Sequence, residues 1–203
     1  MITAYRTVTH ASTGLYKEKG SKFLAFCYPV NSEEEIAAHL AALQKEYYDA
    51  RHHCYAWVLG ADKQKYRAND DGEPNHSAGD PILGQIRSRE LTNTLIVVIR
   101  YFGGIKLGVG GLISAYKQAA EDALNHAVIV ERNITSSLAL HFPYESTSEV
   151  MRLIKEFDLQ IMEQTFEVTC YLKLEVKINL VAQVLSRFDL LTKLGVQLTI
   201  EEV

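Results

Sequence analysis

The segment with the clearest chemical potential is a run rich in glycine near the middle of the chain. Five of the 12 glycines fall within residues 103–111: Gly103, Gly104, Gly108, Gly110 and Gly111. Glycine accepts positive φ angles and lets backbone N–H groups approach a ligand closely. A helix is expected to follow, and its unpaired N–H groups and dipole favour an anion. Lys106 within the run and Arg100 before it add positive charge.

These features predict a site for a phosphate group or a nucleic-acid backbone. A tight corner between a strand and a helix, without a ligand, accounts for the glycines equally well. The standard nucleotide-binding loops do not match, because Gly108 is followed by Val109 where a P-loop has Lys-Ser/Thr. Ile113 would also stand at the third glycine of a dinucleotide fingerprint. The run therefore supports neither ATP nor NAD, and no cofactor is expected.

A second candidate is the acidic turn that contains Asp70, Asp71 and Glu73. Three carboxylates so close together could bind a hard cation or arrange acid–base chemistry. The commoner use of such a sequence is a solvated Asp-Gly turn. The small residues at 77–79 extend the loop and allow it to lie against another backbone segment.

The third candidate is the sequence His52-His53-Cys54. Neighbouring residues of a strand point to opposite faces, so these side chains cannot converge on one metal ion, and no metal site is assigned. Either His53 faces a cleft while Cys54 packs inward, or the reverse. A buried, hydrogen-bonded histidine and an inert cysteine are favoured over a Cys-His nucleophile. Tyr101 and Phe102 could stack on a base, although a place in the core is favoured.

Apolar periodicity predicts the elements that position these residues. A β-branched central strand is expected over 94–102, with further strands over 4–9, 23–30 and 53–59, and the polar connection over 60–67 leaves room for a short strand. Ser32 and Glu35 form a capping box that begins a helix ending near Tyr48. A short helix over 81–88 has Asp80 as its expected cap. The helix over 112–127 presents one apolar face, made of Leu112, Ala115, Tyr116, Ala119, Ala123 and Leu124.

After about Val130 the pattern changes to a β-α-β-β-α-β order, the split βαβ arrangement. The expected strands are 135–142, 159–163, 165–178 and 196–201, and the expected helices are 143–157 and 180–194. Gly195 should end the last helix. The fold class is therefore α+β, with domains over residues 1–131 and 132–203.

The composition is that of an ordinary globular protein, with 203 residues, 47% of them apolar, and a net charge of −4. Residues 1–130 carry 14 basic and 14 acidic side chains, so any anion site must be local. The three cysteines form no CxxC pair and are expected as reduced thiols. No signal core and no run of roughly 20 apolar residues is present, so a cytoplasmic protein without a membrane partner is expected.

Three segments together resemble the signature of the YigZ/IMPACT family. They are DDGEP at 70–74, AGDPIL at 78–83 and RYFGGIKLG at 100–108, and Gly110, Gly111, Leu112, Ala115 and Tyr116 extend the last one. The trailing β-α-β-β-α-β unit is similar to the smaller domain of the bacterial members, so the resemblance spans essentially the whole chain. Family members often have Ser-Gly-Thr after the acidic turn, whereas this chain has Asn75-His76-Ser77.

The resemblance implies an N-terminal α+β domain like the second domain of a small-subunit ribosomal protein. It also implies a C-terminal ferredoxin-like domain similar to one in elongation factor G. Eukaryotic members of the family regulate the amino-acid-starvation response through a ribosome-associated activator. The bacterial members are suspected nucleic-acid binders with no established reaction.

The resulting hypothesis is a translation-linked regulatory protein that binds RNA, a ribosomal component or a protein partner. Arg100, Lys106 and the N–H groups of the glycine run would contact phosphate, and the acidic turn would orient the loop or recognise the partner. The alternative is an enzyme acting on a phosphorylated small molecule, with Mg²⁺ held by Asp71 and Glu73. A third alternative is a protein-interaction module that uses the exposed sheet face of the C-terminal domain.

Overall fold

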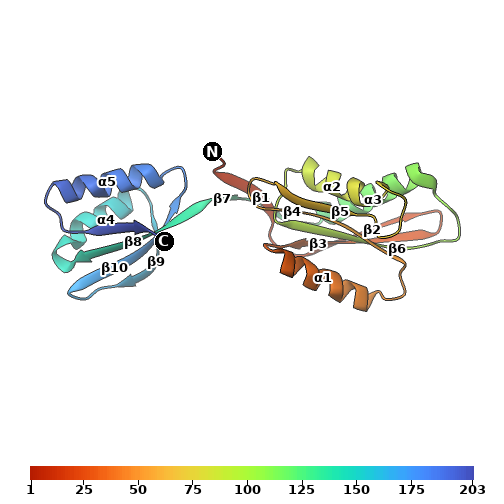
Figure 1. Cartoon of the computed structure of the whole chain (residues 1–203), viewed down its shortest axis with the longest axis horizontal. Coiled ribbons are helices and arrows are strands. Elements are labelled where there is room, and N and C mark those ends of the chain that lie inside the picture. Colours follow the sequence, from red (N-terminus) through yellow and green to blue (C-terminus); the bar gives the residue numbers. More distant parts are fainter. The chain divides into compact units, whose positions relative to one another are not determined.

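A computed structural model describes all 203 residues of the chain. The chain divides into two compact units, Ile2–Arg132 and Asn133–Val203, and each contains helices and a sheet. The mixed α+β class expected from the sequence is confirmed (Figure 1). No helix combines the length and the apolar character that crossing a membrane requires.

The N-terminal unit is built on a five-stranded antiparallel sheet. Its strands lie in the order β2-β3-β6-β4-β5. Their bounds are β2 (Ser12–Glu18), β3 (Ser21–Pro29), β6 (Thr94–Tyr101), β4 (His52–Leu59) and β5 (Lys65–Asn69). Strand β6 occupies the centre, as its β-branched sequence predicts, and seven of its eight residues are buried.

Helices cover both faces of this sheet (Figure 1). Helix α1 (Glu33–Glu46) lies on one face, and helices α2 (Gly79–Ser88) and α3 (Gly108–Asn125) lie on the other. Because side chains alternate along a strand, Ile96 and Val98 of β6 pack with α2 and α3, whereas Leu95, Val97 and Ile99 pack on the α1 side. The middle of the central strand, Leu95–Ile99, is therefore apolar at every position.

Two strands of the N-terminal unit have no counterpart in the sequence prediction. Strand β2 was missed because its residues are largely polar and only one of them is buried. It is held by close packing on α3, where a Cβ on Gly14 would lie 2.3 Å from the backbone N of Ala123. Strand β7 (Ile129–Asn133) was also missed, and it pairs with β1 (Ala4–Val8) in a separate two-stranded sheet.

Helix α1 begins at the capping box that the sequence predicts, but one of the two capping hydrogen bonds has a different donor. The side chain of Ser32 accepts a hydrogen bond from the Glu35 backbone N–H at 3.3 Å, as expected for an N-cap. The Glu35 carboxylate reaches back to the N–H of Asn31 at 2.8 Å rather than to that of Ser32. Both contacts satisfy donors at the helix entry.

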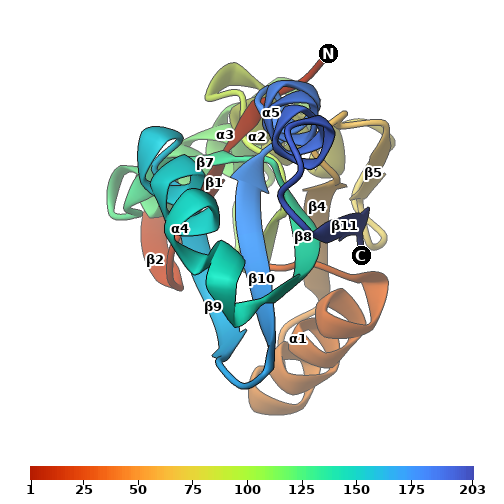
Figure 2. The same ribbon diagram turned by 90° about the vertical axis from the view of Figure 1, so that its left-hand side faces the viewer.

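The C-terminal unit has the β-α-β-β-α-β order that the sequence predicts, with a short 3₁₀ turn η1 (Tyr144–Ser146) added before α4. Its elements are β8 (Thr135–Pro143), α4 (Thr147–Glu156), β9 (Gln160–Thr165), β10 (Thr169–Lys177), α5 (Val181–Lys193) and β11 (Thr199–Glu202). The antiparallel sheet has the order β11-β8-β10-β9. Figure 2 shows α4 and α5 over the same face of this sheet, where Leu140, Leu172 and Phe188 share one core.

Candidate functional site

The acidic turn and the end of β6 meet in a buried ion pair. Nη1 of Arg100 donates to Oε1 of Glu73 at 2.6 Å. Their side chains are only 8% and 4% exposed, so the pair is nearly closed off from solvent. This contact fixes the acidic turn against the sheet and joins two of the three segments singled out in the sequence.

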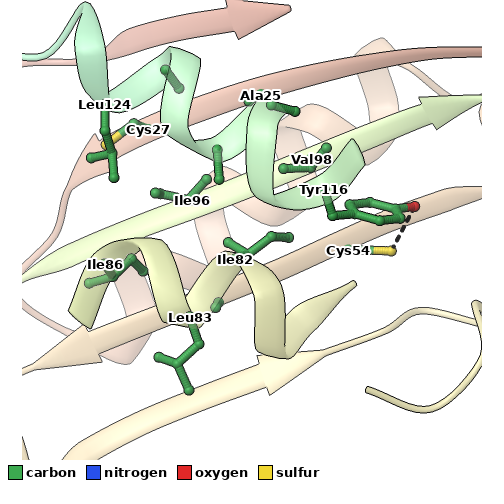
Figure 3. Close-up of a cluster of buried hydrophobic side chains, with 14 of the residues drawn as sticks. Ala25, Cys27, Cys54, Ile82, Leu83, Ile86, Ile96, Val98, Tyr116 and Leu124 are labelled. Carbon is green, nitrogen blue, oxygen red and sulfur yellow. Dashed lines mark hydrogen bonds between the residues drawn. The ribbon is translucent and has the colours of Figure 1, made fainter. Parts of the chain in front are cut away.

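Tyr116 and Cys54 extend this pair into the core. The Tyr116 hydroxyl, on α3, donates to the same Glu73 oxygen at 2.8 Å. The Cys54 sulfur, on β4, lies 3.3 Å from the Tyr116 oxygen, and Figure 3 shows the two side chains pointing toward one another. Burial raises the pKa of Tyr116 and of Cys54 far above the ordinary values. Both groups are therefore neutral, and Cys54 is an inert thiol rather than a nucleophile.

A cleft opens beside the ion pair. Its volume is about 810 Å³, which lies within the usual range for small-molecule sites. Its walls come from the segment before β4, the acidic turn, the end of β6 and the start of α3. The lining residues are Asp49, Ala50, Arg51, His52, Glu73, Pro74, Arg100, Tyr101, Phe102, Lys106, Leu107, Gly108, Val109 and Leu112. The acidic turn and the glycine run thus share one cleft.

Helix α3 begins in this cleft at Gly108, four residues before the start expected from the sequence. Gly110 and Gly111 therefore belong to its first turn and not to a loop. Glycine disfavours a helix by itself, but packing of Leu107 and Leu112 against the core holds this turn in place. No side chain caps the helix, and its first turn has no acidic residue, so the first N–H groups are free for an anion.

The other glycines of the run have separate roles. Gly103 is packed against the β2–β3 turn, and a Cβ there would lie 1.9 Å from the carbonyl carbon of Gly20. Gly104 and Gly108 have open space around them but adopt φ angles of +88° and +72°. These two positions need glycine for their backbone conformation, whereas Gly103 needs it for close packing.

Asp70 caps helix α2 from outside the helix. Its Oδ1 accepts hydrogen bonds from the N–H groups of Ala78 and Gly79, and its Oδ2 accepts one from His76. Burial opposes ionisation of Asp70, but these backbone donors outweigh it and hold its pKa below the ordinary value. The expected cap was Asp80, and that expectation is wrong, because α2 starts at Gly79 without a cap from its own side chains.

The three carboxylates of the acidic turn point to three different partners. Asp70 bonds to the start of α2, and Glu73 bonds to Arg100 and Tyr116. Asp71 Oδ2 accepts a hydrogen bond of 2.6 Å from the His53 backbone N–H. No group of three or more His, Cys, Asp or Glu side chains is placed to hold a metal ion.

His53 lies away from the cleft. It is buried and, by the alternation along β4, is on the α1 face, while Cys54 packs in the core on the α2 and α3 face. Its Nε2 has no hydrogen-bond partner, so the expected hydrogen-bonded histidine is only half right. The neighbouring His52 lines the cleft instead and pairs in register with Arg100.

Arg51 lines the cleft although the sequence did not single it out, and Phe102 lines it although a place in the core was favoured. Arg51 is exposed at the cleft, and Phe102 is 56% exposed there rather than part of the core. Tyr101 packs partly on the α1 side, and its hydroxyl donates to Asp49 at 2.7 Å. The only sequence signal for Arg51 and His52 was their position at the start of a strand. That position does not show which residues of the neighbouring strand lie beside them.

Comparisons with known proteins identify the family of this chain. Residues 19–124 match the model of the Impact N-terminal domain. IMPACT family member YvyE of Bacillus subtilis is 35% identical over 163 residues, which cover 80% of this chain and 75% of that protein. IMPACT family member YigZ of Escherichia coli is 32% identical over 167 residues, or 81% of this chain and 82% of that protein.

A solved structure shows the same fold over nearly the whole chain. It is described as the crystal structure of a hypothetical protein, is 28% identical in sequence and superposes with a TM-score of 0.69. The match covers 98% of this chain and 97% of that one. The domain model contains both the acidic turn and the glycine run, and the relatives extend the match beyond it. On these grounds the chain is a member of the IMPACT family.

Proposed function

We propose that this protein is a translation-linked regulator that binds RNA, alone or within a ribosomal particle, through the cleft at the start of α3. One observation carries the proposal: an uncapped helix N-terminus, the exposed Lys106 and the side chain of Arg100 line the same cleft. Backbone N–H groups at a helix start and basic side chains are common partners of nucleic-acid phosphates.

The charges in the cleft limit how strong this binding can be. Glu73 already balances the charge of Arg100, so Lys106 and Arg51 supply the net positive charge. Residues 1–130 carry equal numbers of basic and acidic side chains, which leaves no broad basic surface. We therefore expect binding through few phosphate contacts, with a shallow dependence on salt.

Membership of the IMPACT family supports the link to translation. The role of family members in the starvation response, as the resemblance implies it, places them near the ribosome. The cleft is what makes the proposal testable at the level of residues.

The test is the affinity for a short single-stranded RNA, measured by fluorescence anisotropy at several salt concentrations. Two contacts to phosphate predict a slope of log K against log salt of about −1.4, since each contact to a single strand contributes about −0.7. Lys106→Ala should weaken binding and make the slope shallower by about 0.7. Lys117→Ala removes an exposed lysine of α3 that does not line the cleft, and should change neither. Absence of binding at low salt, or equal binding by Lys106→Ala, contradicts the proposal.

A second candidate function is an enzyme acting on a phosphorylated small molecule. The observation in its favour is the cleft volume of about 810 Å³, which suits a small ligand. The Mg²⁺ version has less support, because Asp71 and Glu73 bond to different groups. A thermal-shift screen with nucleotides and Mg²⁺ separates the two functions. Stabilisation by a small ligand, together with turnover, would favour the enzyme, and no stabilisation would favour RNA.

A further inference from the structure

The geometry points to a specific ligand for this cleft: we propose that it recognises the terminal phosphate of a nucleotide. The ligand class is a nucleoside 5′-monophosphate, either free or as the 5′-phosphorylated end of an RNA, rather than the internal backbone of a strand. This inference rests on the proposed function, because it uses the same cleft and the same cations.

Arg100 keeps guanidinium donors that no protein group uses. Its Nη1 is bonded to Glu73, while its Nε is buried and has no hydrogen-bond partner. Because Nε is closed off from solvent, Nη2 is the donor of this guanidinium that an anion in the cleft can reach, through a charge-assisted hydrogen bond. Tyr116 donates to the same Glu73 oxygen and so helps to fix the carboxylate that holds Arg100 in this orientation. Glu73 and Tyr116 are therefore positioning residues for the anion site.

Two further groups of donors line the same cleft. The first turn of α3 offers N–H groups that no side chain caps, and Lys106 is exposed just before that turn. A terminal phosphate has three free oxygens and a charge of about −1.5 to −2 at pH 7. An internal phosphodiester has only two free oxygens and a single charge. Three kinds of donor in one cleft therefore match the terminal group better.

Phe102 offers a surface for the nucleoside part of the ligand. Its side chain is 56% exposed and lines the cleft. The guanidinium carbon of Arg100 lies 5.6 Å from the centre of its ring, so the aromatic surface adjoins the anion site. Val109, 52% exposed, and Leu112 extend the apolar part of the lining. Bases stack on exposed aromatic rings in single-stranded nucleic-acid sites.

The charge of the cleft suits the phosphorylated end of an RNA better than the internal backbone of a nucleic-acid strand. Among its lining residues Arg51, Arg100 and Lys106 face two carboxylates, Asp49 and Glu73, which leaves one excess positive charge. Proteins that bind along a single nucleic-acid strand use an extended positive groove. Residues 1–130 carry equal numbers of basic and acidic side chains, so they provide no extended positive potential. A volume of about 810 Å³ accommodates one nucleotide-sized ligand.

The experiment compares two RNAs of one sequence, labelled at the 3′ end, with either a 5′-phosphate or a 5′-hydroxyl. Anisotropy should show roughly tenfold tighter binding of the 5′-phosphate RNA. AMP should compete, whereas adenosine and inorganic phosphate should compete at least roughly tenfold less well. Lys106→Ala should remove most of this preference, Phe102→Ala should weaken the binding of AMP and of both RNAs alike, and Lys117→Ala should change neither property. All three side chains are exposed, so circular dichroism should show folded variants.

Each other outcome has a defined meaning. Equal binding of the two RNAs, lost in Lys106→Ala, overturns recognition of the end and leaves the proposed function standing. Binding of AMP with no binding of either RNA supports the free nucleotide as ligand and overturns the proposed function. Binding of neither AMP nor RNA overturns both. Competition by a phosphoserine peptide as strong as that by AMP overturns the assignment to a nucleotide.

Discussion

Arg100 and Glu73 lie 27 residues apart in the sequence, yet their side chains meet at 2.6 Å in a nearly solvent-free ion pair. The pair joins the last part of β6 to the acidic turn and forms one wall of the cleft. A buried charge is costly unless it is paired and hydrogen-bonded. The position of the acidic turn is therefore tied to the integrity of this one contact.

Loss of charge at Glu73 should destabilise the protein strongly. Glu73→Gln leaves the buried Arg100 without its counter-charge, and we expect a loss of about 3 kcal/mol in the free energy of unfolding. Urea denaturation followed by circular dichroism measures it. Tyr116→Phe removes one hydrogen bond to the same oxygen and should cost only about 1 kcal/mol. An apolar double replacement, Arg100→Met with Glu73→Leu, should recover much of the loss, and failure to do so would mean that packing rather than charge holds the turn.

Asp70 should stabilise the fold at neutral pH and lose its effect in acid. Its pKa is held below the ordinary value in the folded protein, so its contribution is present above the pKa of the unfolded state and disappears as pH falls through the folded pKa. Asp70→Asn replaces one of the two accepting oxygens by an NH₂ group that cannot accept, and should lower stability at pH 7 by about 1 kcal/mol. The difference between the two proteins should shrink as the pH falls below about 4. A difference that stays constant down to pH 3 or so would show that Asp70 does not titrate in this way.

His76 occupies a backbone conformation that favours glycine. Its φ is +64°, and family members often have glycine at this point of the loop. A residue with a Cβ in the left-handed region carries a strain of roughly 1 kcal/mol. His76→Gly should therefore be more stable than His76→Ala by about 1 kcal/mol in thermal unfolding. The ion pair of His76 with Asp80 is largely exposed and contributes little. Equal stability of the two variants would show that the left-handed conformation at residue 76 carries no measurable strain.

Two glycines of the run should respond to alanine in opposite ways. Gly103→Ala places a Cβ 1.9 Å from Gly20, so the β2–β3 turn must move and stability should fall by more than about 2 kcal/mol. Gly110→Ala meets no neighbouring atom within 4 Å and lies inside helix α3, so it should raise stability by about 0.5–1 kcal/mol. Thermal and urea unfolding of the pair measure both. A destabilised Gly110→Ala would indicate that the first turn of α3 is not helical in solution.

Local patterns predicted those elements that the sequence encodes locally. The β-branched run of β6, the apolar face of α3 from Leu112 to Leu124 and the Ser32 cap of α1 all depend on residues within one element. They were found because alternation, helical spacing and capping each leave a signal over a few residues. The same holds for the β-α-β-β-α-β order of the C-terminal unit.

Contacts between distant segments could not be predicted in this way. Asp70 caps a helix that starts nine residues later, and the nearer Asp80 looked like the better cap by spacing alone. Arg100 was expected to be a free cation, but its partner Glu73 became visible only once β6 and the acidic turn were placed together. Strand β2 depends on the close approach of Gly14 to α3. Its polar sequence has no alternating apolar pattern from which a strand could be predicted.

The hydrogen-bonded series from Arg100 through Glu73 and Tyr116 to Cys54 leads from the wall of the cleft to the centre of the N-terminal unit. Occupation of the cleft will therefore restrain more than the groups that touch the ligand. Amide hydrogen exchange in β4 and in the middle of α3 should slow when an anion binds to Arg100, since local opening would have to break this series as well. Slower exchange at these interior amides would then report that the cleft is occupied, and unchanged exchange would show that the series does not transmit the restraint.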